Sequence, residues 1–216
     1  ENNIAAIHPG YGFLSENYIF AKRIEESGIK FIGPSWKAIK AMGNKNNAKK
    51  NISSANIPLV KGFLVDKKKL GENKMKAKDI GFPVIAKAAA GGGGKGMRVV
   101  YSEGELQNSI EAVIREAQSS FKDDEVIVEK YINGGKHIEI QIARDTYGNC
   151  IHLFERDCSS QRRYQKVLEE APALSIPQVT KQKMYKAAID IANKIDYQSL
   201  GTIEFIVDIQ SNKSDP

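Results

Sequence analysis

A run of glycines beside lysines is the first feature of this sequence that could do chemistry. The run reads Gly91, Gly92, Gly93, Gly94, Lys95 and Gly96. Consecutive glycines leave backbone N–H groups unshielded, so several of them can approach phosphate oxygens. Lys95 and the nearby Lys87 would bring positive charge to the same phosphates. The segment predicts a phosphate-binding loop, and a flexible surface loop is the alternative.

Two common nucleotide motifs do not fit this loop. Gly91, Gly93 and Gly96 match the GxGxxG pattern, but a dinucleotide fingerprint leads from a strand into a helix. Residues 97–100 (Met-Arg-Val-Val) instead predict a second strand. A Walker loop needs Ser or Thr after its lysine, where this chain has Gly96. The remaining interpretation is a strand–loop–strand flap.

Two further strand segments carry polar side chains that could have a function. Residues 137–142 alternate polar and isoleucine side chains, so His137, Glu139 and Gln141 share one strand face. That face is either functional or simply the wet side of the sheet. Glu204 lies in an apolar strand, where a buried carboxylate is costly unless it is paired or binds a metal. Because Mg²⁺ prefers carboxylates together with phosphate oxygens, we expect Glu204 to be a metal ligand; the alternative is an outward-facing residue.

Two charged segments follow predicted strands. Glu129 and Lys130 come after strand 125–128, where free backbone groups at a strand end would suit an adenine edge. The alternative is a solvated charge pair. Residues 155–166 are rich in arginine and lysine and predict a loop that holds phosphate or carboxylate oxygens. A solvated charged loop is the alternative there.

The elements that must position these residues fall into three groups. Strands 4–7 and 29–32 around helix 18–26 resemble the tail of a doubly wound unit, and helices 38–42 and 46–55 follow. The second group has three strands and one helix, which begins with a capping box of Ser102 and Glu105. Its apolar stripe is Leu106, Ile110, Val113, Ala117 and Phe121. The third group is antiparallel: strands 137–142, 150–155 and 201–208, with helix 181–195. The fold class is therefore α/β with an α+β part.

Composition narrows the class of protein. The chain has 216 residues, 41% of them hydrophobic and 27% charged, which is ordinary for a globular protein. The net charge is +6, but the lysines are scattered without interleaved aromatics, so we expect no nucleic-acid partner. No stretch approaches the length of a membrane span. Two widely spaced cysteines, Cys150 and Cys158, predict a reducing, cytoplasmic compartment. The chain starts without Met and we expect it to be incomplete at both ends, so a mitochondrial leader is an open alternative.

Several long motifs resemble one family throughout the chain: His8–Asn17, Phe31–Pro34, the glycine loop, and residues 155–172. They are similar to the biotin carboxylase component of biotin-dependent carboxylases. The resemblance implies an ATP-grasp fold with four segments: the end of an N-terminal domain (1–33), a helical connector (34–60), a lid subdomain with the glycine loop (61–131), and the start of an antiparallel subdomain (132–216).

The same resemblance implies a reaction and its residues. Bicarbonate and MgATP form carboxyphosphate, and biotin on a carrier protein or domain is then carboxylated. Lys45, Lys87 and His137 would contact phosphates beneath the closing glycine loop. The remaining implied roles are adenine for Glu129 and Lys130, the nucleotide and phosphate site for Gln161, bicarbonate for Gln165 and Lys166, biotin for Tyr11 and Gly12, and Mg²⁺ or Mn²⁺ for Glu204. His137, Gln161, Gln165 and Lys166 are the implied catalytic residues.

Two departures from the family pattern matter. Tyr164 stands where most relatives have His; a phenol can bond a ribose but brings no cationic form near neutral pH. The second metal-binding Glu, the catalytic Arg and the general base would lie beyond Pro216, so we do not expect this polypeptide to turn over alone.

Within the family, residues 38–43, 57–60 and 153–156 are most similar to methylcrotonyl-CoA carboxylase alpha subunits, and acetyl-CoA and propionyl-CoA carboxylases are close alternatives. The expected partners are a biotin carrier, a carboxyltransferase subunit and further copies of the chain, and not a membrane. The alternatives are another bicarbonate-activating ATP-grasp ligase, such as a carbamoyl-phosphate synthase relative, or a catalytically incomplete nucleotide-binding chain. The His8–Asn17 motif argues against the former.

Overall fold

The structure is a computed structural model that describes residues 3–52, 57–90 and 94–209. Gly91, Gly92 and Gly93 of the predicted phosphate loop lie outside the described residues. The chain divides into two compact units. The larger unit comprises residues 1–57, 136–159 and 169–207, and the smaller unit comprises residues 58–135, 160–168 and 208–216.

The larger unit begins with the predicted strand–helix–strand segment. Strands β1 (Ala6–Ile7) and β2 (Lys30–Phe31) pair in parallel, and α1 (Tyr18–Glu26) lies between them in the chain. The last residue of the His8–Asn17 motif starts the helix, since Asn17 Oδ1 accepts hydrogen bonds from the first-turn amides of Ile19 and Phe20. Two short helices follow, α2 (Trp36–Met42) and α3 (Lys45–Ile52). These two helices match the predicted helices 38–42 and 46–55 as far as residue 52, and residues 53–56 lie outside the described residues.

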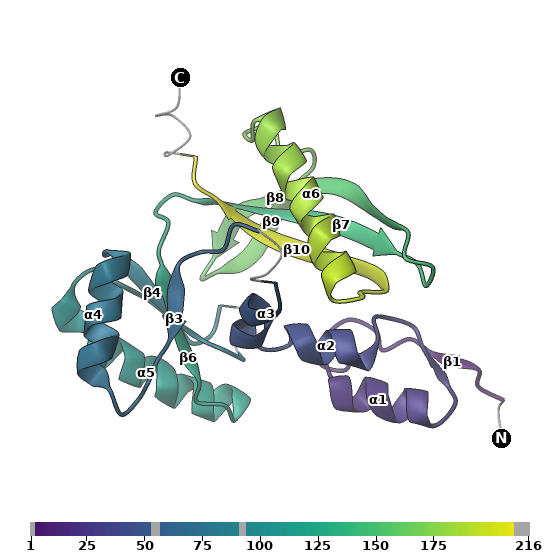
Figure 1. Ribbon diagram of the computed structural model, residues 1–216, viewed down its shortest axis with the longest axis horizontal. Coiled ribbons are helices and arrows are strands. Elements are labelled where there is room, and N and C mark those ends of the chain that lie inside the picture. The colour runs from purple at the N-terminus through teal and green to yellow at the C-terminus, as the bar shows by residue number, and fades with distance from the viewer. Residues whose placement is uncertain (1–2, 53–56, 91–93, 210–216) are drawn as a thin grey trace. The chain divides into compact units, whose positions relative to one another are not determined.

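The rest of the larger unit is built on a four-stranded sheet of order β10–β7–β8–β9. Residues 160–168, at the end of β8 and the start of β9, belong to the smaller unit. Its strands are β7 (Lys136–Arg144), β8 (Cys150–Arg162), β9 (Gln165–Glu170) and β10 (Ser199–Val207). Helix α6 (Gln178–Lys194) lies across one face (Figure 1). Ile138, Ile140 and Ile142 are fully buried, which confirms the predicted alternation. The polar residues between them therefore share the face opposite α6.

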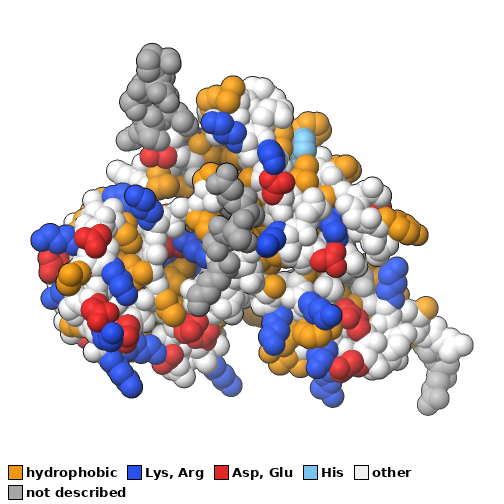
Figure 2. Space-filling model, in the orientation of Figure 1, with side chains coloured by type: hydrophobic (Ala, Val, Ile, Leu, Met, Phe, Trp, Pro, Cys, Tyr) orange, Lys and Arg blue, Asp and Glu red, His pale blue; other side chains and the backbone are white. Residues whose placement is uncertain are grey.

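The smaller unit pairs a second four-stranded sheet with two helices. The sheet order is β3–β6–β4–β5, with β3 (Gly62–Leu64), β4 (Val84–Ala88), β5 (Met97–Val100) and β6 (Val126–Lys130). The helices are α4 (Leu70–Ile80) and α5 (Glu103–Phe121). The predicted stripe of α5 packs into the core beside Val84, Val100 and Val128. Positive and negative side chains are interspersed over the outward surface of these helices (Figure 2). Exposed pairs of this kind contribute little, so the apolar stripe is what holds α5 in place.

Among the local predictions, the capping box and the end of strand 150–155 are wrong, and strand β3 and helix α4 were not predicted. Ser102 occupies the N-cap of α5 but makes no side-chain cap bond, and Glu105 instead accepts from the Tyr101 amide at 3.1 Å, so no capping box forms. The strand beginning at Cys150 continues to Arg162, because β7 and β9 pair along both of its edges. Segments 62–64 and 70–80 were assigned no element; α4 buries only Asn73 and Ala77, so it lacks the apolar stripe that predicts a helix.

None of the helices in the described ranges combines the length and apolar composition that crossing a bilayer requires.

Candidate functional site

The polar face of the larger unit's sheet brings three predicted or suspected ligands together. Glu139 on β7 lies directly opposite Glu204 on β10, and His137 lies opposite Ile206. His137 Nε2 is 3.5 Å from Glu204 Oε1. One ligand atom from each of His137, Glu139 and Glu204 lies within 4.8 Å of the other two. This convergence comes from register, because residues opposite each other in an antiparallel pair point to the same face.

The burial of the two carboxylates reverses what the sequence predicts. Glu204 was expected to be a buried carboxylate in an apolar strand, but its side chain is 55% exposed. Glu139, on the face that could have been wet, is only 1% exposed. The reason is that Glu139 lies on an inner strand and binds Arg156 of β8. The face that holds Glu139 is therefore not simply a wet face.

The donor set suits a hard divalent cation. Carboxylate oxygens such as those of Glu139 and Glu204 are the ligands that Mg²⁺ and Mn²⁺ prefer. The imidazole of His137 is a poorer ligand for Mg²⁺ and a better hydrogen-bond donor to phosphate. The three residues thus fit a cation held by carboxylates, with His137 beside it.

The smaller unit presents a buried ion pair at the predicted phosphate lysine. Lys87 Nζ donates to Glu129 Oε2 at 2.8 Å, and the two side chains are 22% and 8% exposed. Lys87 is on β4 and Glu129 on the adjacent β6. The carboxylate thus holds the ammonium group of Lys87 at one position on the sheet.

The predicted strand end at Val128 is wrong. Strand β6 continues through Lys130 because it lies between β3 and β4, and Glu129 pairs with Gly62 on one side and Ile85 on the other. The Lys130 amide donates to Lys61 O at 2.8 Å. Its ammonium group donates to two carbonyls, Gly81 O at 2.9 Å and Phe82 O at 3.3 Å. The Glu129 and Lys130 side chains thus already have partners inside the smaller unit.

The predicted charged loop at 155–166 is instead a β-hairpin. Gln161 is the residue before the last of β8 and Gln165 begins β9, so both lie close to the two-residue turn. The turn residues Arg163 and Tyr164 have φ values of 52° and 64°, which match the primed turns that join twisted strands. Lys166 follows on β9 as an exposed residue. The sequence alone shows that this segment is rich in charged residues. It does not show the hairpin, because the pairing of β8 with β9 depends on the tertiary structure.

Tyr164 stays a neutral phenol in this hairpin. Burial raises the pKa of Tyr164, and the nearby hydroxyls of Tyr131 and Tyr101 raise it further. The side chain is 43% exposed, so its hydroxyl can reach a ligand. At this position the chain offers a hydrogen bond and no charge.

The described end of the glycine loop packs against the same hairpin. Gly94 has φ +77°, and a Cβ at this residue would lie 2.5 Å from Arg163 O and 2.8 Å from Tyr164 Cβ. Gly96 O accepts from the Ala88 amide at 2.9 Å and closes the base of the loop. Only glycine allows this close approach of two backbones.

We therefore expect Gly94→Ala to destabilise the protein by about 1–3 kcal/mol, the usual cost of a strained backbone position. The clash of the new Cβ with the hairpin should add to this loss. Urea denaturation measures it. Gly104→Ala is the matched control: Gly104 is in α5 with no atom near its added Cβ. Alanine there should stabilise the helix by up to about 1 kcal/mol. Equal unfolding of the two variants would contradict the close packing.

The other predicted site residues belong to further segments of the chain. Lys45 is the first residue of α3. Tyr11 and Gly12 lie in the loop after β1, where Tyr11 is fully exposed. Lys95 is an exposed residue of the glycine loop.

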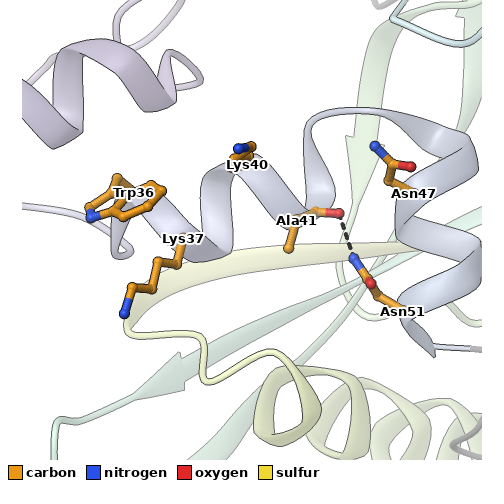
Figure 3. A pocket seen from close by; sticks show the side chains of 6 residues that line it. All are labelled: Trp36, Lys37, Lys40, Ala41, Asn47 and Asn51. Carbon is orange, nitrogen blue, oxygen red and sulfur yellow. Dashed lines mark hydrogen bonds between the residues drawn. The ribbon is translucent and has the colours of Figure 1, made fainter.

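A separate surface pocket lies between α2 and α3. Its volume is about 350 Å³, and it is lined by Trp36, Lys37, Lys40, Ala41, Asn47 and Asn51 (Figure 3). Asn51 Nδ2 donates to Ala41 O at 3.0 Å across it. None of the predicted site residues lines this pocket, so we do not assign it to the nucleotide.

Sequence reasoning did not single out Arg156 and Glu169 as site residues, and it left the role of Glu139 open. The side chain of Arg156 bonds Glu139 and lies 3.5 Å from Glu169 Oε2. The signal for Glu139 was present, since it lies between His137 and Gln141 on one strand face. Arg156 had no such signal among several arginines of the same run.

Comparison with known protein families identifies the domains of this chain. Residues 44–214 match the family described as carbamoyl-phosphate synthase L chain, ATP binding domain, and residues 1–39 match the biotin carboxylase N-terminal domain. Together with the strand order and helices above, these matches make the larger part of the chain an ATP-binding domain of the ATP-grasp fold, as predicted. The chain belongs to the biotin carboxylase family.

Similar proteins extend well beyond this chain. A methylcrotonoyl-CoA carboxylase subunit alpha from Dictyostelium discoideum is 50% identical over 94% of the chain, which spans 29% of that protein. A pyruvate carboxylase from Aspergillus niger is 44% identical over 98% of the chain and 18% of its own length. A biotin carboxylase–β,γ-ATP complex from Campylobacter jejuni matches with a TM-score of 0.92 at 45% identity, over 95% of this chain and 46% of that one. The chain thus spans less than a third of its curated relatives.

Proposed function

We propose that the protein carboxylates biotin on a carrier, using ATP and bicarbonate, as the biotin carboxylase component of an acyl-CoA carboxylase. The observation on which this rests is the convergence of His137, Glu139 and Glu204 on one sheet face of a biotin carboxylase family member. A solved relative from Hydrogenobacter thermophilus, 46% identical with a TM-score of 0.91, is a complex with MgADP, ADP and bicarbonate. That complex supports the same ligands for this chain.

In this proposal the cation site lies on the larger unit's sheet. Glu204, with Glu139 nearby, would hold Mg²⁺ or Mn²⁺, and His137 would donate to a phosphate oxygen. The bound cation would neutralise negative charge on the phosphates. Because phosphoryl transfer depends mostly on positioning and charge neutralisation, fixed donors matter more here than a reactive nucleophile.

The residues of the smaller unit would bind the remaining parts of the substrates. Lys87 would contact phosphate while Glu129 holds its ammonium group, and the glycine loop would exclude water from carboxyphosphate. Glu129 and Lys130 would flank the adenine chiefly through their backbone. The hairpin would supply Gln161 to the nucleotide and phosphate site, Gln165 and Lys166 to bicarbonate, and Tyr164 to the ribose.

The remaining assignments concern the larger unit's first segment and the assembly. Lys45 would contact phosphate, and Tyr11 and Gly12 would lie near biotin. The matches to residues 1–39 and 44–214 support one division of the chain near residue 40, and the domain division at 33, 60 and 131 stays a prediction. The proposed partners are a biotin carrier protein or domain, a carboxyltransferase of the methylcrotonyl-CoA type, and a second copy of the chain. We propose a reducing compartment, the cytoplasm or the mitochondrion, as several relatives are mitochondrial.

Calorimetry and ATP cleavage test this function in the natural full-length chain. We expect MgATP to bind, and ATP cleavage to require bicarbonate and to rise with free biotin. Binding should disappear when EDTA removes the cation, because the carboxylates then repel the phosphates. ATP cleavage that requires bicarbonate but does not rise with biotin would indicate a different bicarbonate-activating ligase. Absence of MgATP binding would refute both.

A further inference from the structure

Arg156 connects the strands that surround the proposed cation site. Its guanidinium donates to Glu139 Oε1 through Nε and to Gln141 Oε1 through Nη2, the latter at 3.2 Å. Its Nε also lies 3.5 Å from Glu169 Oε2 on β9. One side chain on β8 thus contacts acidic or amide groups on both neighbouring strands.

Gln141 extends this network to the fourth strand. Its Nε2 donates to Gly201 O at 2.8 Å, and Thr202 Oγ1 donates to Gln141 Oε1 at 3.2 Å. Gly201 and Thr202 belong to β10, the strand that also holds Glu204. The network therefore fixes β7, β8, β9 and β10 to one another on the face that holds the site.

The contact between Arg156 and Glu139 balances a buried charge in addition to joining two strands. Glu139 is 1% exposed, and a carboxylate so deeply buried is costly unless a cation is paired with it. Arg156 is charged at all physiological pH values and binds carboxylates with a rigid fork of donors. It thus cancels a negative charge that lies within 4.8 Å of the ligand atoms of His137 and Glu204.

We propose that Arg156 is a positioning residue of the cation site, which orients Glu139 beside His137 and Glu204 and makes the site one charge less negative. This rests on the proposed function. A less negative site binds Mg²⁺ weakly by itself and strongly only together with ATP phosphates, since Mg²⁺ typically shares its ligands between one or two carboxylates and a phosphate. Arg156 would thereby make metal binding depend on the nucleotide.

The test is the affinity for Mn²⁺ without nucleotide, measured by electron paramagnetic resonance in the natural full-length chain. Arg156→Met should bind Mn²⁺ at least about tenfold more tightly, because one unit of charge a few Å from a cation is worth at least that factor at an effective dielectric constant of about 20. Glu139→Gln should bind it at least about tenfold more weakly for the same reason. The double variant R156M/E139Q should return close to the wild-type affinity.

A role in folding alone would not give effects of opposite sign. Arg144→Met is the matched control: Arg144 ends β7 and pairs with Asp196, so it should leave Mn²⁺ affinity unchanged. Should Arg156→Met fail to fold, Glu139→Gln and the double variant decide, because weaker binding in the first and recovery in the second are still required.

The outcomes separate the two proposals. Wild-type protein that binds neither Mn²⁺ nor Mn·ATP would refute the proposed function. Wild-type protein that binds Mn·ATP, with nucleotide-free Mn²⁺ affinity equal or reduced in folded Arg156→Met, would overturn the role of Arg156 alone. Glu139→Gln without effect on Mn²⁺ would overturn it too.

Discussion

Lys87→Met is expected to lower bicarbonate-dependent ATP cleavage by about 100-fold or more, the usual loss when one charge-stabilising donor is removed from a preorganised site. Lys87 is a good candidate for such a donor, because Glu129 holds its ammonium group at 2.8 Å on a rigid sheet. Turnover by the natural full-length chain under saturating MgATP, bicarbonate and biotin measures the effect. Turnover within twofold of wild type would remove Lys87 from the phosphate site.

The same variant also loses stability, so the two effects need separating. Glu129 is 6% exposed, and leaving its carboxylate without Lys87 should cost about 3–5 kcal/mol. Lys87→Met/Glu129→Gln should recover most of that stability and none of the turnover. Arg98→Met on β5 is the control, since its pair with Glu116 is long and exposed, 3.7 Å between Nη2 and Oε2. Recovery of turnover in the double variant would mean that Lys87 acts through folding only.

Lys181→Met should lower the stability of the larger unit by about 3–5 kcal/mol, because it leaves a buried carboxylate without its cation. Lys181 Nζ is 2.6 Å from Glu155 Oε1, and the two side chains are 10% and 2% exposed. Glu155 also accepts from the Tyr185 hydroxyl and from the Ala173 amide. This pair fastens α6 to β8, on the face of the sheet opposite the site. Urea denaturation measures the change.

The pKa of Glu155 also predicts that Lys181→Met loses stability. Burial raises the pKa of Glu155, but hydrogen bonds from Lys181 and Tyr185 outweigh burial and hold the pKa below its usual value. A carboxyl with a lowered pKa stabilises the fold above its unfolded pKa, and the stabilisation disappears as the pH falls through the lower folded value. Lys181→Met should therefore remove stability at neutral pH and leave less of it to lose in acid.

A lysine on the exposed side of the same helix is the control. Lys186 pairs with Asp190 at 2.8 Å, but its side chain is 77% exposed. Lys186→Met should change stability by less than about 1 kcal/mol. Lys181→Met/Glu155→Gln should recover most of the loss. Identical unfolding of Lys181→Met and Lys186→Met would show that the Glu155 pair does not stabilise the fold.

Local pattern was enough for several elements. The alternation of residues 137–142 predicted a strand with buried isoleucines, and the stripe from Leu106 to Phe121 predicted α5, because each burial pattern repeats with the period of its own backbone. Prediction failed for strand ends that depend on the neighbouring strands. Strand β6 extends through Lys130, and β8 through Arg162, because flanking strands offer partners that their own residues do not reveal.

The glycine loop, Lys87, His137 and Glu204 could be picked out by residue type, and the long motifs determined the family. Only the tertiary structure decided which charged groups lie next to one another. Register places Glu139 opposite Glu204, and strand pairing places Arg156 over Glu139, between residues 17 positions apart in the chain. Burial then follows from these partners: Glu139 is enclosed with its arginine, while Glu204 remains exposed. The sequence determined which chemical groups are present, and packing determined which charges lie close enough to balance one another.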